Sequence, residues 1–170
     1  MITEATYVYM KNGTVVQTDA QGVRGAVLEG FEKLGGAEFF HRLTKTFYGL
    51  VAKDELIGPM FAGDWDRHAR HLAAHFIRLY GRPDLAEIWN PNFLRAHLDH
   101  VIGQRHRLRW LALMAQAGQE ISAPQPVFDD FMLIMLMSAS VEITGFSHGA
   151  AMARGSEVSA ADDLTGSGGA

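Results

Sequence analysis

The chain has 170 residues, of which 48% are hydrophobic, and its formal net charge at pH 7 is -4. This size and composition fit one soluble globular domain, and the negative net charge argues against nucleic acid as a partner, because phosphate binding needs a surplus of Lys and Arg. The absence of cysteine excludes disulfides, thiolate nucleophiles and cysteine-based zinc sites. No apolar run approaches the ~20 residues of a membrane span, and no signal-peptide pattern opens the chain. We therefore expect a cytoplasmic protein that binds neither membranes nor nucleic acids.

The first twenty residues differ in pattern from the rest. The segment "TYVYMKNGTVVQT" places β-branched and aromatic residues on both sides of Asn12-Gly13, a dipeptide typical of tight hairpin turns. It predicts a short β-hairpin, with a mobile tail as the alternative because an isolated hairpin is marginal in water. The domain organisation predicted is an N-terminal arm over 1–20, one folded domain over 21–153 and a disordered, small and polar tail over 154–170.

Helical periodicity begins at about residue 24 and continues to the tail. Glycine pairs and prolines punctuate it, and Asp64 stands where an N-cap is needed. The segment 84–103 is irregular, with room for a short helix before His97. Helices are predicted over about 26–34, 37–55, 64–80, 104–118 and 126–152. The fold class is therefore all-α, with helices packed on helices.

The helix over 64–80 carries histidines within an apolar face. Residues three and four apart share a face, and here these are Trp65, His68, Leu72, Leu79 and either His75 or Phe76. His71 lies off that face beside arginines, so we expect it in solvent. An all-α domain with inward aromatic side chains and a few histidines can hold a large flat apolar cofactor, with one imidazole as axial iron ligand. From the residues alone, Tyr48 and Trp110 are more typical of core packing.

Four segments together carry a family resemblance: "GGAEFFHRLTKTFYGLVAKDELIGPMF", "DWDRHARHL", "RPDLAEIW" and "HLDHVIGQRHRLRW". Over about residues 24–150 the chain resembles the truncated haemoglobins, which are globin-like two-over-two helical sandwiches around haem. The most specific element is His97 followed by Ile102-Gly103 and Trp110, a spacing that resembles the second group of that family. The pattern "W-x-x-H-x-x-x-L" at 65–72 is similar to the third group, in which a distal histidine is common.

The resemblance implies haem b as cofactor and assigns roles to single residues. His97 would be the proximal iron ligand and the only metal ligand, and His100 is its rival because it lies three residues further on. The implied ligand-binding residues on the distal side are Tyr48, His68 and Trp110. The implied haem-contacting residues are His97, Phe61, Leu72, Arg95 and Phe76, with Arg95 directed to a propionate or else a plain surface charge.

A cage of up to three hydrogen-bond donors would hold a ligand that carries partial negative charge. The function expected is therefore a haem protein that binds dioxygen, nitric oxide or carbon monoxide, for redox chemistry or sensing more than for oxygen transport. Peroxidase-like or nitric oxide dioxygenase activity and an unidentified reductase partner fit this interpretation. One alternative is a non-haem metal site at His68, His71 and His75, of which His71 and His75 stand four residues apart. Another is a helical interaction module with a Met-rich groove at 131–137.

Overall fold

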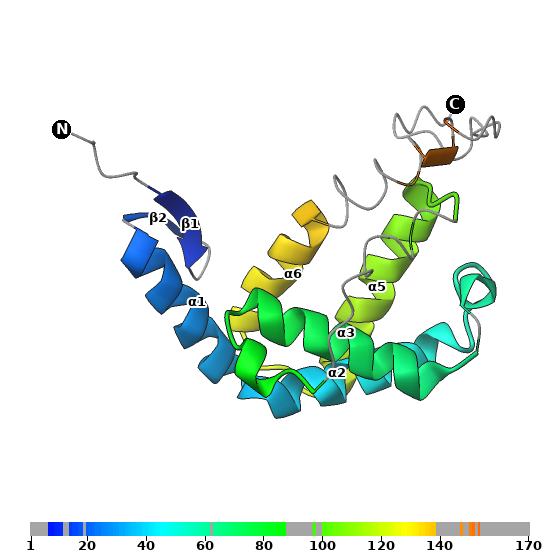
Figure 1. The fold of residues 1–170 in the computed structure, drawn as a ribbon, viewed down its shortest axis with the longest axis horizontal. Helices are drawn as coiled ribbons and strands as arrows, with labels where there is room; N and C mark the ends of the chain where they lie inside the picture. The colour runs from blue at the N-terminus through cyan, green and yellow to red at the C-terminus, as the bar shows by residue number, and fades with distance from the viewer. Residues whose placement is uncertain are drawn as a thin grey trace.

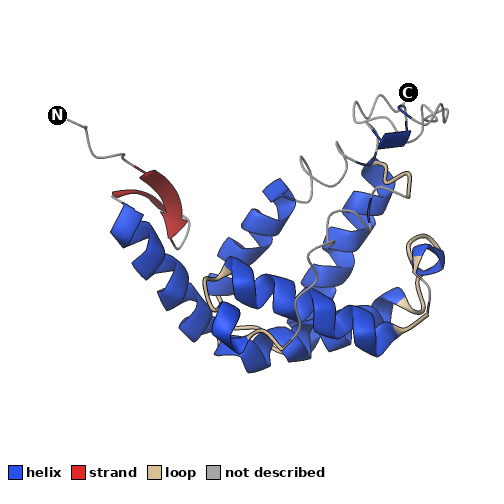
Figure 2. Cartoon of the chain, viewed as in Figure 1, coloured by secondary structure: helices blue, strands red, loops and turns tan. Residues whose placement is uncertain are grey.

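The structure is a computed structural model of the chain. It describes residues 7–11, 14–18, 20–61, 63–87, 97, 100–138, 147, 150, 151 and 153. Figures 1 and 2 show a helical body with a small hairpin at its N-terminal end. The class is all-α, as predicted. Among the described residues, no helix is long and apolar enough to cross a membrane.

The N-terminal hairpin consists of strands β1 (Tyr7–Lys11) and β2 (Thr14–Thr18). The strands pair antiparallel, with Tyr7 opposite Thr18 and Lys11 opposite Thr14. This register leaves two residues between the strands, as the Asn12-Gly13 dipeptide predicted. The hairpin lies against α1 and also reaches α6 (Figure 1). The predicted hairpin is confirmed, and contact with two helices gives it the support that an isolated hairpin lacks.

The helices follow the predicted order, although several of their boundaries differ from the prediction. The helix α1 begins at Ala20, inside the segment assigned to the arm, and ends at Leu34, directly before Gly35, whose φ of 108° is favourable only for glycine. Described residues of the last helix stop at Ser138, and residues 147, 150, 151 and 153 are helical again. The elements are α1 (Ala20–Leu34), α2 (Gly36–Val51), η1 (Gly58–Met60), α3 (Trp65–Leu79), η2 (Pro83–Leu85), α5 (Gln104–Glu120) and α6 (Val127–Ser138).

Two helical layers form the body of the protein. Figure 1 shows α2 and α3 side by side, with α5 and α6 crossing them. The core between the layers is aromatic, and the fully buried Phe40 lies at its centre. Its ring contacts five others: Phe31, Phe39, Phe76, Tyr80 and Phe131. Since these rings come from α1, α2, α6 and the α3 segment, burial of one cluster fixes the helices relative to each other.

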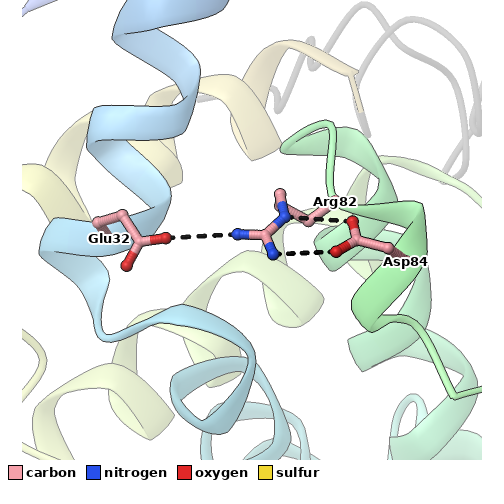
Figure 3. Close-up of polar contacts among 3 residues, drawn as sticks. All are labelled: Glu32, Arg82 and Asp84. Atoms are coloured by element: carbon pink, nitrogen blue, oxygen red, sulfur yellow. Dashed lines mark hydrogen bonds and ion pairs between the residues drawn. The ribbon is translucent and has the colours of Figure 1, made fainter.

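An exposed arginine joins α1 to the turn after α3. Figure 3 shows Arg82 between Asp84 and Glu32. Its Nε and Nη2 donate to both carboxylate oxygens of Asp84 at 3.1 and 2.9 Å, and Nη1 reaches Glu32 at 3.5 Å. The guanidinium also lies 5.7 Å from the ring centre of Phe31. The planar fork therefore orients α1, although exposed pairs of this kind add little stability.

Candidate functional site

The site begins at the C-terminal end of α2, where Phe47 and Tyr48 are adjacent. Neighbouring residues on a helix point about 100° apart, so the two rings serve different contacts. Phe47 turns toward α5 and lies edge-on to Trp110, with ring centres 5.2 Å apart. Tyr48 turns toward the other side and is 7% exposed. The apolar face of α2 places both rings inside the protein, one toward each neighbouring element.

Tyr48 belongs to a cluster of four rings: Tyr48, Phe61, Trp65 and His68. Each ring contacts the other three, with centre-to-centre distances from 5.2 to 6.4 Å. The imidazole of His68 lies nearly parallel to the Tyr48 ring, at 28° and 5.6 Å. The sequence expectation named three of these residues and placed Trp65 only on the same helix face. Trp65 lies three residues before His68 and therefore on the same side of the helix. This spacing was the signal that could have assigned Trp65 to the site.

The end of α2, the η1 corner and the start of α3 supply the cluster. The side chain of Asp64 accepts a hydrogen bond from the Arg67 amide at 3.2 Å, which confirms the predicted N-cap of α3. This cap fixes the first turn of the helix, where Trp65 and His68 lie one above the other. Trp110 stands apart, since its ring reaches the cluster through Phe47. Of the three expected donors, the structure therefore brings Tyr48 and His68 together and holds Trp110 one ring away.

The Tyr48 hydroxyl is a buried polar group with no hydrogen-bond partner in the part of the chain that the structure describes. Burial raises the pKa of Tyr48 above its ordinary value, so the group stays a neutral O–H donor at physiological pH. A buried hydroxyl without a partner costs folding free energy. Such a group suits a site that a ligand completes.

Both histidines of α3 that line this region are uncharged at neutral pH. Burial lowers the pKa of His68, and Asp64 opposes this while the charges of Arg67 and His71 add to it. Burial, with a smaller contribution from the charge of His97, lowers the pKa of His75 to about 4. The contribution from the charge of His97 also indicates that His75 lies near His97. His71 is partly buried, so it is less open to solvent than the sequence predicted.

The two candidate iron ligands differ in exposure. His97 is partly buried, whereas His100 is exposed. The remaining expected haem contacts lie on α3: Leu72 is buried one turn after His68, and Phe76 is buried between Phe40 and Phe131 at 5.9 and 5.2 Å. Phe76 therefore lies in the aromatic core, and its contact with a cofactor stays a prediction. Arg95 lies outside the described residues.

These residues fit a haem better than a free metal ion. A partly buried imidazole near α3, apolar side chains on that helix and a buried O–H donor that no described residue satisfies are the chemical set that a haem needs. Over the described part of the chain, no group of three His, Asp or Glu side chains is arranged to hold a metal. The alternative of a metal site at His68, His71 and His75 therefore finds no support there. The crossed helical layers and the aromatic site between them define a protein of the globin class.

The chain belongs to the family of bacterial-like globins, whose family model matches residues 29–140. Among solved structures it is similar to the truncated oxygen-avid haemoglobin of Bacillus subtilis, with 24% identity, 67% of this chain and 98% of that chain covered, and a TM-score of 0.60. It is also similar to the group II truncated haemoglobin of Bacillus anthracis, with 25% identity, coverage of 67% and 89%, and a TM-score of 0.60.

A third similar structure is the thermostable haemoglobin of the actinobacterium Thermobifida fusca, with 26% identity, coverage of 67% and 95%, and a TM-score of 0.59. No curated protein sequence matches the chain. These likenesses confirm the expected globin fold and the resemblance to truncated haemoglobins, including the second group. The likeness of residues 65–72 to the third group is not supported by them.

Proposed function

We propose that this chain binds haem b through His97 and holds a diatomic ligand on the opposite side with a cage of hydrogen-bond donors. Haem, when bound, supplies an iron that takes dioxygen, nitric oxide or carbon monoxide and exchanges electrons. The observation that carries the proposal is the buried Tyr48 hydroxyl, which has no partner among the described residues. The partial burial of His97, against the exposure of His100, supports His97 as the ligand to iron.

The three proposed donors should contribute unequally to ligand binding. The rings of Tyr48 and His68 lie side by side, whereas that of Trp110 lies beyond Phe47. The Tyr48 hydroxyl is buried beside the neutral imidazole of His68, so both can donate without first giving up a strong internal bond. The Trp110 indole can only donate, and its contact with Phe47 fixes its plane. Donors held in a dry site stabilise partial negative charge more strongly than donors in water.

This arrangement favours retention of the ligand over rapid release. At about 1 kcal/mol net for each hydrogen bond, two or three bonds slow release ~30- to 200-fold. A carrier must release its ligand, whereas redox chemistry or sensing profits from holding it. We therefore favour these roles over oxygen transport, with a separate reductase as the source of electrons.

Two measurements test the proposal. The purified chain should show a Soret absorption band that is lost in His97→Ala and kept in His100→Ala. In stopped-flow measurements on the haem-loaded protein, Tyr48→Phe should speed dioxygen release by about fivefold or more, the loss of about one hydrogen bond. Trp110→Phe should have a smaller effect, because that ring stands outside the four-ring cluster. A colourless protein, or release rates unchanged in both variants, contradicts the proposal.

A further inference from the structure

Ser147 is one of three buried polar or charged residues in the described chain, together with Thr44 and Asp54. Its side chain is fully buried, at 0% exposure. It lies beyond residue 140, where the match to the family model ends, and is helical. A buried hydroxyl needs partners, and those of Ser147 lie about 45 residues earlier in the chain.

The hydroxyl of Ser147 uses both of its hydrogen-bonding functions on one short loop. It donates to the carbonyl oxygen of His100, and it accepts from the Ile102 amide at 2.8 Å. The two backbone groups belong to the loop that connects His97 to α5. One side chain therefore fixes this loop on either side of residue 101, where no regular element holds the backbone.

The same loop is attached at both of its ends. The His100 amide approaches the His97 carbonyl oxygen at 3.4 Å, which closes a turn directly after the candidate iron ligand. At the other end, the Gly103 amide donates to Nδ1 of His106 at 3.0 Å and thereby caps α5. Ser147 bonds residues 100 and 102, which lie between His97 and the first turn of α5.

We propose that Ser147 is a positioning residue for His97: its hydroxyl locks the loop after the proximal histidine and so sets the orientation of that imidazole toward haem iron. The imidazole direction follows from the backbone that carries it, and this backbone is fixed three residues later by Ser147. Ligand orientation by surrounding hydrogen bonds commonly tunes the strength of a metal–imidazole bond. This inference rests on the proposed haem function, since it needs His97 as ligand.

The test uses the full chain and compares Ser147→Ala with Thr44→Val. Both substitutions remove a fully buried hydroxyl at little cost in volume. The Thr44 hydroxyl bonds to carbonyl oxygens of its own helix, at 2.9 Å to Phe40, and so serves as the matched control. The readouts are the iron–histidine stretching band of the ferrous, ligand-free protein by resonance Raman, the rate of haem transfer to a scavenging apoprotein, and hydrogen exchange at the Ile102 amide.

In Ser147→Ala we expect the Soret band to persist, the iron–histidine band to shift or broaden, and haem loss and Ile102 exchange to become about tenfold faster, which corresponds to the loss of one to two hydrogen bonds. Thr44→Val should leave all three readouts unchanged. An unshifted band in Ser147→Ala, or the same shift in both variants, overturns the proposal. If no variant shows a Soret band, the haem function fails, and Ile102 exchange still decides the lock: unchanged exchange in Ser147→Ala refutes it independently.

Discussion

Asp54 is a buried carboxylate that ties the corner after α2 to α5. One oxygen accepts from the amides of Leu56 and Ile57 at 3.1 and 2.9 Å, and the other accepts from Arg109 Nε at 2.5 Å. Its side chain is 4% exposed, whereas that of Arg109 is 48% exposed. Because Arg109 precedes Trp110 and the corner leads to Phe61, this pair fixes the spacing between two sides of the candidate site.

We predict that Asp54→Asn lowers the free energy of unfolding by about 1–2 kcal/mol at pH 7. The amide oxygen of asparagine can keep the two backbone bonds, so the loss is mainly the charge-assisted bond to Arg109, worth ~1.5–3 kcal/mol. In the variant, water hydrates the half-exposed guanidinium in place of the lost carboxylate. The expected loss of stability therefore lies at the lower end of that range. Urea unfolding of the full chain measures the difference.

The dependence on pH separates the ion pair from a simple packing effect. Burial alone would raise the pKa of Asp54, but hydrogen bonds from the Ile57 amide and the Arg109 guanidinium hold it below its ordinary value. A lowered pKa in the folded state contributes stability above the unfolded pKa of about 4, and this contribution is lost as the pH falls through the folded value. The gap between wild type and Asp54→Asn should therefore be constant from pH 7 to 5 and shrink below about pH 4.

A double-mutant cycle with Arg109→Gln isolates the pair. We expect a coupling energy of about 1 kcal/mol at pH 7 between the two substitutions, because each one alone already removes the same bond. A coupling near zero, together with a wild-type advantage that does not change down to pH 3, would refute the assignment of this stability to the ion pair.

Four further substitutions test the packing. Gly118→Ala should destabilise the protein by about 1–3 kcal/mol, because the new Cβ would lie 2.2 Å from Cε1 of Phe128. Gly49→Ala should raise the stability of the protein by ~0.5–1 kcal/mol, because nothing lies within 4 Å of the new Cβ. Phe40→Ala should cost ~3–5 kcal/mol, since that ring is fully buried. Leu79→Ala, at a position 53% exposed, should change stability by less than about 0.5 kcal/mol. Urea midpoints check all four, and equal effects of Phe40→Ala and Leu79→Ala would contradict the described core.

Local patterns explain which elements the sequence could predict. The Asn12-Gly13 dipeptide and the Asp64 cap act within a few residues of the chain. The hairpin and the start of α3 can therefore be predicted from the local sequence. The start of α1 does not, because Gly22 and Gly25 lower helix propensity and the helix there is supported by the hairpin packed on it. Propensity was overridden by tertiary contact.

The same distinction between local and non-local contacts explains which parts of the candidate site could be predicted. Tyr48 and His68 could be expected together because both follow from helix periodicity and the family pattern, and the structure places their rings 5.6 Å apart. The tie between Asp54 and Arg109 spans 55 residues, and no local pattern pairs one carboxylate with one of several arginines. Ser147 gave no signal either, since an isolated serine before a polar tail resembles any other surface residue. Non-local hydrogen bonds of this kind can be read only after the helices are placed.

The folded unit is larger than the segment that the family model matches. The match covers residues 29–140, yet α1 begins at Ala20, and both Ser147 and Ala151 are fully buried. A chain shortened to residue 140 would lose two fully buried residues and free the backbone groups that Ser147 bonds. Such a chain should therefore lose stability, and the haem that we propose it binds should dissociate faster, even though every residue of the four-ring cluster is retained. Ser147, beyond the match, bonds the backbone next to His97, and the residues within the match include the proposed donors.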